Sequence, residues 1–275
     1  ILFLLLKNHG LKKTLREIKG MFSFVFFDTE KNIIFCARDH FGQKPLYYTN
    51  KSHFSCSTSI KPLANFEKKV SFDKECIDFY LNSSGILPID KTLYKNIYSL
   101  PAGKYLKYNL NTKKIIIQEY FHPSDLISKK NYKHLNKFNS LSLEKKLRSK
   151  IYRAVKNCSI SDVKVGTLLS GGIDSSLVTY YAKKINSKIT SFTGISEGIE
   201  NIPKKIVPKI VKQIKLTDPI FVNHRPEDYL KKLFQLITRN YSPSRWGGGV
   251  PMSNICKVAK KKEIKVLLSG DAVDE

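Results

Sequence analysis

The hydrophobic pattern changes between the first and second halves of the chain. Residues 2–19 carry leucines at helical spacing, and Gly20 is expected to end that helix. The next part alternates short apolar or aromatic runs with polar turns, and a short helix is expected at 73–81. The runs that predict strands cover residues 21–27, 33–38, 45–48, 53–57, 104–109 and 114–120. This pattern predicts an α+β unit made mostly of strands.

The second half has a different hydrophobic pattern, which begins after a polar stretch. Residues 123–141 contain few apolar positions and are predicted to link a domain at 1–122 to a domain at 142–275. A helix face follows at Leu143, Leu147, Ile151 and Val155. Strands and helices then alternate, which predicts an α/β domain with a parallel sheet covered by helices on both faces.

The expected strands of this domain lie at 163–169, 189–195, 220–223 and 264–268, and the expected helices at 175–185, 204–214, 227–238 and 252–262. Pro208 falls inside the second of these helices, where we expect it to kink or shorten the helix.

The composition suggests a basic protein of two domains. The 275 residues include 48 Lys or Arg and 23 Asp or Glu, which gives a formal net charge of +25. Such a charge suggests a nucleic-acid-binding module, but the basic residues are mostly lysines scattered along the chain. We therefore favour a solvated basic surface, with nucleic-acid binding as an alternative.

The longest apolar run, Ile1–Leu6, is far too short to cross a bilayer, so no membrane span is expected.

Metal sites built from cysteine or histidine are not expected. The five cysteines are widely spaced and form no Cys-x-x-Cys pair, which suggests reduced thiols and a cytoplasmic protein. His224 follows a predicted strand but has no second His or Cys at ligand spacing, so we expect no metal there.

The first chemical motif is a Ser-Gly-Gly sequence between a strand and a helix. Residues 170–176 read Ser-Gly-Gly-Ile-Asp-Ser-Ser directly after the apolar strand. Glycines let backbone N–H groups approach a ligand, and the following helix N-terminus favours an anion such as phosphate. No Walker lysine is present. Asp174 beside a phosphate is best explained by a bridging Mg²⁺.

The second motif lies about 100 residues further on, at an equivalent strand end. Residues 269–275 read Ser-Gly-Asp-Ala-Val-Asp-Glu. Ser269 and Gly270 would line a nucleotide, and Asp274 would supply a second Mg²⁺ ligand. Acidic residues are scarce in this chain, so this local cluster favours a metal and nucleotide site over a solvated turn.

These residues resemble the glutamine-hydrolysing asparagine synthetase family. Residues 170–176 match its SGGxDSS loop and residues 269–275 its SGxGxDE motif. The first half also resembles the family at Gly20–Phe26, at Ala37–Tyr48 and at Leu100–Gly103. The resemblance covers essentially the whole chain in order, and we expect the chain to be a fragment of a family member, cut at both ends and inactive by itself.

The resemblance implies an incomplete N-terminal-nucleophile glutaminase sandwich followed by an incomplete parallel sheet of the pyrophosphate-loop ATPase type. The implied enzyme converts aspartate to asparagine through β-aspartyl-AMP, releases AMP and pyrophosphate, and takes ammonia from glutamine. Its substrates are ATP, aspartate and glutamine, Mg²⁺ assists, and a homodimer is compatible with the family. The glutaminase nucleophile, an N-terminal Cys in the family, has no counterpart among Cys36, Cys56 or Cys76.

By position, the resemblance also assigns the site. Asp271 is the candidate catalytic acid that lines the intermediate, and Asp174 and Asp274 are the candidate metal ligands. The candidate ATP-binding residues are Leu169, Ser170, Gly171, Gly172, Asp174, Ser175, Ser176, Gly194, Ser269 and Gly270.

Two departures from the family pattern keep the acceptor open. Ala272 stands where the family carries Gly, and the stretch after Gly194 has Glu197 and Glu200 instead of the usual Asp-Glu pair. An amidotransferase or lactam-forming synthetase of the same fold, acting on another carboxylate such as a surface-polysaccharide precursor, is therefore the main alternative.

Overall fold

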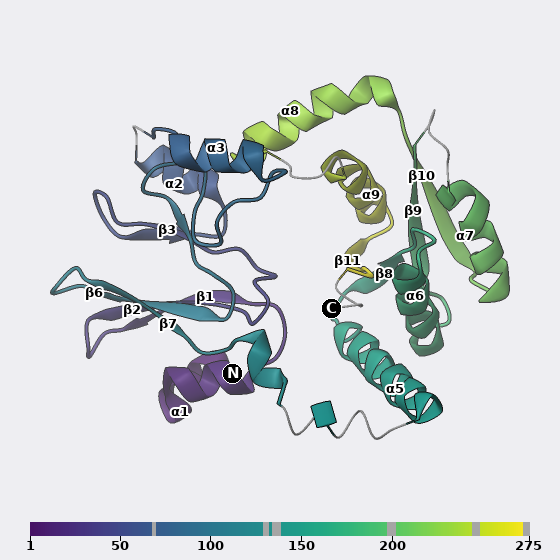
Figure 1. Ribbon diagram of the computed structural model, residues 1–275, viewed down its shortest axis with the longest axis horizontal. Helices are drawn as coiled ribbons and strands as arrows, with labels where there is room; N and C mark the ends of the chain where they lie inside the picture. The colour runs from purple at the N-terminus through teal and green to yellow at the C-terminus, as the bar shows by residue number, and fades with distance from the viewer. Residues whose placement is uncertain (68–69, 129–131, 134–138, 197–201, 244–247, 272–275) are drawn as a thin grey trace. The chain divides into compact units, whose positions relative to one another are not determined.

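The computed structural model describes residues 1–275 except 68–69, 129–131, 134–138, 197–201, 244–247 and 272–275. The chain forms two compact units (Figure 1). The first comprises residues 1–132 and 237–245, and the second comprises residues 133–236 and 246–275. No described helix is both long enough and apolar enough to span a membrane.

The first unit contains two antiparallel sheets that share one apolar core. The larger sheet has the order β1-β2-β6-β7 and the smaller has the order β4-β3-β5. Buried Cys36 and Leu106 from the larger sheet pack in the same cluster as Tyr48 and Leu100 from the smaller sheet and its flank. The predicted α+β character of this half is thereby confirmed.

The strands of this unit are β1 (Ser23–Asp28), β2 (Ile33–Arg38), β3 (Tyr47–Thr49), β4 (Ser55–Ser57), β5 (Tyr98–Ser99), β6 (Lys104–Asn109) and β7 (Ile115–Glu119), and its helices are α1 (Leu2–Glu17), α2 (Ile60–Phe66), α3 (Lys74–Asn82) and the 3₁₀ turn η1 (Pro123–Leu126). Helix α2 and strand β5 were not expected from the sequence, because each is too short to show a period.

The first helix is not the continuous helix that its leucines predict. Gly10 interrupts α1 with φ 73° and ψ 167°, a conformation that glycine adopts without steric cost. The second segment still buries Leu15 completely against the larger sheet, beside Ala37 and Tyr105. The expected apolar side, Leu4, Leu5, Leu11 and Leu15, is thus right for Leu15, but before Gly10 it is Leu6 that is buried while Leu4 is exposed, and the break at Gly10 was missed.

The loop after β2 is organised by the partly buried side chain of Arg38 and the buried side chain of Asp39. Arg38 donates from Nη1 to the carbonyl of Leu100 at 2.7 Å and from Nη2 to the carbonyl of Gly42 at 2.7 Å. The fully buried carboxylate of Asp39 accepts hydrogen bonds from four backbone N–H groups, those of Phe22, Phe41, Gln43 and Lys44. In the segment Ala37–Tyr48, which resembles the family, these two side chains thus fix the backbone.

Replacing Asp39 with alanine should lower the free energy of unfolding of the first unit by about 3 kcal/mol, since four backbone donors lose their buried, charged acceptor. Urea unfolding followed by circular dichroism measures the change. Asp28→Ala is the matched control, because Asp28 accepts one backbone hydrogen bond in the turn before β2, from Lys31. The control should cost less than about 1.5 kcal/mol. Equal losses for the two variants would contradict this explanation.

The second unit is built on a parallel sheet with the strand order β10-β9-β8-β11. Its strands are β8 (Lys164–Leu168), β9 (Thr190–Ser196), β10 (Asp218–His224) and β11 (Ile264–Leu268). The helices that follow or precede them are α5 (Ser140–Cys158), α6 (Ile173–Ile185), α7 (Ile202–Gln213), η2 (Pro226–Asp228), α8 (Tyr229–Asn240) and α9 (Gly249–Lys261). The predicted α/β architecture with a parallel sheet is confirmed.

Helices cover both faces of this sheet (Figure 1). On one face Val155 of α5, Val178 of α6 and Val207 of α7 pack with Leu169 and Leu268. On the other face Ile255 and Ala259 of α9 pack with Phe192, Val222 and Ile264. The neighbouring residues Leu267 and Leu268 of β11 therefore pack in separate cores, as a doubly covered sheet requires.

Pro208 does not shorten its helix as the sequence suggests. Helix α7 runs from Ile202 to Gln213 with Pro208 inside it. The proline removes only one backbone donor, and the adjacent Val207 is completely buried in the core beside the sheet. Packing of that apolar face outweighs the missing hydrogen bond.

Candidate functional site

Both Ser-Gly motifs lie at the carboxyl ends of neighbouring parallel strands. Strand β8 pairs with β11, and Thr167 lies beside Leu268 in the register. Ser170 follows β8 closely and Ser269 follows β11 directly, so the two motifs leave the sheet at the same edge. This is the edge at which open parallel sheets bind their ligands.

The loop between β8 and α6 is held by its own serine hydroxyls. Ser175 Oγ lies 2.9 Å from Ser170 Oγ, accepts from the Ser170 N–H at 3.2 Å and donates to the Gly172 carbonyl at 3.2 Å. Ser176 Oγ donates to the same carbonyl at 2.6 Å. Ser175 is buried, so its hydroxyl shapes the loop and is less open to a ligand than the sequence suggests.

Backbone geometry leaves N–H groups of this loop available to a ligand. Gly171 has φ +92°, a conformation that side chains rarely tolerate. Gly172 is the N-cap of α6 and provides no side-chain cap. The first N–H groups of the helix therefore lack the intrahelical and side-chain partners that a capped helix would have, which favours an anion there.

The second motif touches the first through Gly270. A Cβ on Gly270 would lie 2.5 Å from the backbone N of Ser175 and 2.8 Å from the carbonyl carbon of Asp174. Only glycine allows the chain after β11 to approach the first turn of α6 this closely. The two motifs, about 100 residues apart in the sequence, thus form one continuous wall.

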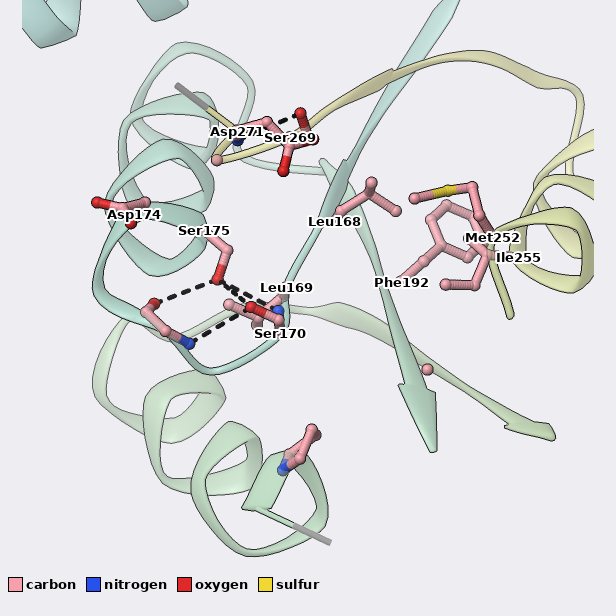
Figure 2. A pocket seen from close by; sticks show the side chains of 14 residues that line it. Leu168, Leu169, Ser170, Asp174, Ser175, Phe192, Met252, Ile255, Ser269 and Asp271 are labelled. Carbon is pink, nitrogen blue, oxygen red and sulfur yellow. Dashed lines mark hydrogen bonds between the residues drawn. The ribbon is translucent and has the colours of Figure 1, made fainter. Parts of the chain in front are cut away.

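A pocket of about 390 Å³ opens at this edge of the sheet. Figure 2 shows Leu168, Phe192, Met252 and Ile255 together on one side, and Ser170, Ser175 and Asp174 on the other. The pocket is lined by Leu168, Leu169, Ser170, Gly172, Asp174, Ser175, Phe192, Gly194, Pro203, Met252, Ile255, Ser269, Gly270 and Asp271. It thus combines an apolar wall with a polar wall of hydroxyls, backbone amides and two carboxylates.

Most of the residues predicted from the sequence meet in this pocket. Gly171 and Ser176 belong to the same loop but do not line it. Asp274, Ala272, Glu197 and Glu200 lie outside the described residues. The prediction missed the apolar wall, although Phe192 could have been found from Gly194, two positions along the same strand face.

The carboxylates available here are those of Asp174 and Asp271, and both line the pocket. Carboxylate oxygens beside a phosphate-binding loop are the donors that Mg²⁺ prefers, so these residues fit that ion. Among the residues that the structure describes, no group of three His, Cys, Asp or Glu side chains is arranged to hold a metal. A full ligand set would need further groups besides these two carboxylates.

Comparison with known proteins gives two family matches, one for each half of the chain. Residues 1–121 match a glutamine amidotransferase domain family, and residues 146–275 match the asparagine synthase family. Among solved structures, an NH3-dependent NAD synthetase from Campylobacter jejuni is 18% identical and covers 47% of this chain and 56% of its own, with a TM-score of 0.31. That likeness is too low for any structural conclusion.

Several curated proteins are similar over nearly the whole chain. A Methanocaldococcus jannaschii protein that carries the asparagine synthetase name is 30% identical over 94% of this chain and 49% of its own length. Asparagine synthetase [glutamine-hydrolyzing] 1 of Bacillus subtilis is 28% identical over 98% of this chain and 41% of its own length. The chain therefore spans half or less of these relatives. With both family matches in order along it, the chain is similar to glutamine-hydrolysing asparagine synthetases over nearly its whole length.

Proposed function

We propose that the protein is an ATP-dependent amide ligase that converts aspartate to asparagine through β-aspartyl-AMP, using ammonia from glutamine and releasing AMP and pyrophosphate. The observation that carries this proposal is the pocket in which both Ser-Gly motifs meet beside an apolar wall. Its location at the carboxyl ends of β8 and β11 supports a nucleotide site, and the similarity to asparagine synthetases supports the reaction.

The two walls of the pocket suggest how ATP would bind. The base would lie against Leu168, Phe192, Met252 and Ile255, with Gly194 allowing close approach. The pyrophosphate part would bind the N–H groups of the loop at Gly171 and Gly172 and the first turn of α6. Ser269 and Gly270 would line the AMP part from the second motif.

This arrangement suits attack at the α-phosphate. The β-carboxylate of aspartate would form a bond to the α-phosphorus while the bond to pyrophosphate breaks. Negative charge develops on the leaving group, and the loop amides at the helix N-terminus would stabilise it. Mg²⁺, held by Asp174 and Asp274, would add Lewis-acid stabilisation of the same charge. Asp271 would lie beside the acyl-adenylate that ammonia then attacks to release AMP.

We further propose that the first unit is a glutaminase of the N-terminal-nucleophile sandwich kind. Its two antiparallel sheets around one core support this assignment. None of Cys36, Cys56 or Cys76 is proposed as the nucleophile. A hydrogen bond to Cys56 and burial raise the pKa of the Cys36 thiol, and burial raises the pKa of the Cys76 thiol, so both are poor nucleophiles.

All five cysteines are unpaired, which supports a cytoplasmic location. A homodimer remains our expectation.

Product analysis of the full-length protein tests the reaction. With ATP, Mg²⁺, glutamine and aspartate we expect AMP, pyrophosphate and asparagine in equal amounts. Other carboxylates in place of aspartate test the alternative acceptor, and turnover with one of them but not with aspartate would overturn the asparagine assignment. DNA and RNA binding at low salt tests the basic surface, where tight binding without any turnover would favour the nucleic-acid alternative.

A further inference from the structure

The last residue of β10, His224, is a buried histidine directly behind the nucleotide pocket. It is 7% exposed. Its Nδ1 accepts a hydrogen bond from the side-chain amide Nδ2 of Asn254 at 3.1 Å. Asn254 lies on α9, between Met252 and Ile255, which line the pocket. The histidine thus connects the end of a strand to the helix that supplies the apolar wall.

The other ring nitrogen faces a glycine of the pocket. A Cβ on Gly194 would lie 2.7 Å from His224 Nε2 and 3.5 Å from Ile255 Cδ1. The missing side chain of Gly194 therefore points toward His224 and α9, and the imidazole occupies the space behind it. Nε2 itself has no hydrogen-bond partner among the described residues. A buried polar atom without a partner has a free-energy cost, so this nitrogen adds nothing to stability where it lies.

We propose that His224 is a positioning residue for nucleotide binding, which sets the distance between α9 and β9 by bonding Asn254 and packing against Gly194. This inference rests on the proposed ATP site. Through these two contacts a side chain that does not line the pocket would fix the apolar wall formed by Met252, Ile255 and Phe192. Removal of the contact should then loosen the wall and weaken ATP binding.

The contact should also depend on the charge of the imidazole. Burial and the positive charge of Lys232 on α8 lower the pKa of His224 below its ordinary value of 6.5. At neutral pH the ring is therefore neutral, and Nδ1 can accept from Asn254. Below that lowered pKa, Nδ1 carries a proton and can no longer accept, and a charge faces Asn254, Gly194 and Lys232. ATP affinity is expected to be full above the pKa of His224 and to fall as the pH drops through it.

The test measures binding of a nonhydrolysable ATP analogue to the full-length protein by titration calorimetry, with thermal unfolding as a check on folding. His224→Leu should weaken binding about fivefold to tenfold, as expected for one buried hydrogen bond and its packing. His224→Gln keeps an acceptor and should restore most of the affinity, but without the loss of affinity at low pH. Asn223→Ala is the matched control, because Asn223 is the exposed neighbour of His224 on the same strand.

A double variant separates the positioning role from a merely structural one, because the two roles predict opposite changes in affinity when the second substitution is added. Gly194→Ala should weaken binding at least tenfold, since its new methyl group collides with the imidazole. Gly194→Ala combined with His224→Ala should bind more tightly than Gly194→Ala alone, because the smaller side chain removes the collision. If His224→Leu fails to fold, this pair and the pH dependence of the wild-type protein decide the question.

Failure of the proposed ATP site and failure of the role of His224 would give different results. If the wild-type protein fails to bind the analogue, the proposed ATP site is wrong. If the wild-type protein binds, but His224→Leu binds equally well and the two alanine substitutions weaken binding additively, the ATP site stands and the positioning role of His224 is wrong.

Discussion

Replacing Asp174 with asparagine should reduce pyrophosphate release from ATP and aspartate at least about 100-fold, which corresponds to roughly 3 kcal/mol of lost charge stabilisation. Asp174 lies in the first turn of α6 and lines the pocket. Its carboxylate accepts no hydrogen bond from the described residues, so no structural role is assigned to it. The substitution keeps the shape of the side chain and removes the charge that Mg²⁺ needs. Release of radiolabelled pyrophosphate, measured over a range of Mg²⁺ concentrations, would report the change.

Two controls separate loss of a metal ligand from loss of structure. Asp218→Asn makes the same change at the amino end of β10, where Asp218 accepts from Thr190 Oγ1 at 2.6 Å, and should leave turnover intact. Glutamine hydrolysis in the same Asp174→Asn preparation should also be retained, since that activity is assigned to the first unit. Unchanged pyrophosphate release by Asp174→Asn would show that this carboxylate does not hold the metal.

The features that the sequence predicted well are those set by neighbouring residues. The loop from Ser170 to Ser176 could be predicted because one short stretch contains the strand end, the glycines and the first turn of the helix. The alternation of strands and helices in the second half likewise depends on local period. In both cases the structure adds hydrogen bonds to an arrangement that was already specified locally.

The features that were missed depend on contacts between distant segments. Met252 and Ile255 line the pocket because α9 covers the face of the sheet that bears Phe192, and no local period reveals which helix covers which face. The connection of His224 to Asn254 was missed for the same reason. The break in α1 was missed because Gly10 lies between two well-formed apolar runs, and the leucine spacing alone suggested continuity.

The assignment of the first unit shows a related limit. Arg38 and Asp39 could be matched to a family segment, but the match did not say what the side chains do. The structure shows that both hold backbone groups in place, through carbonyl acceptors for Arg38 and N–H donors for Asp39, and that Arg38 also donates to Ser99 Oγ. A charged pair in a matched segment can therefore serve the fold rather than the chemistry.

Replacing Gly270 with alanine should have an effect as large as that of Asp174→Asn, but by a steric route. The new Cβ would lie within 3 Å of three backbone atoms of Asp174 and Ser175, and these atoms belong to the first turn of a helix that cannot move aside cheaply. The strand end would be pushed away from the phosphate loop. We expect nucleotide binding to weaken about 100-fold and the second unit to lose about 1–3 kcal/mol of unfolding free energy.

Titration of an ATP analogue and urea unfolding together distinguish the site from the fold. Gly248→Ala is the matched control, since a Cβ at that position would meet nothing within 4 Å in the same unit. Gly172→Ala is intermediate, because its Cβ would meet only Ser170 Oγ, at 3.6 Å. The Gly172→Ala variant should fold normally, and its nucleotide binding should weaken only if the new methyl group blocks the ligand. Wild-type affinity in Gly270→Ala would mean that the two motifs need not touch to form the site. If the loss of affinity increases from Gly248→Ala through Gly172→Ala to Gly270→Ala, the contact between the two Ser-Gly motifs defines the nucleotide pocket.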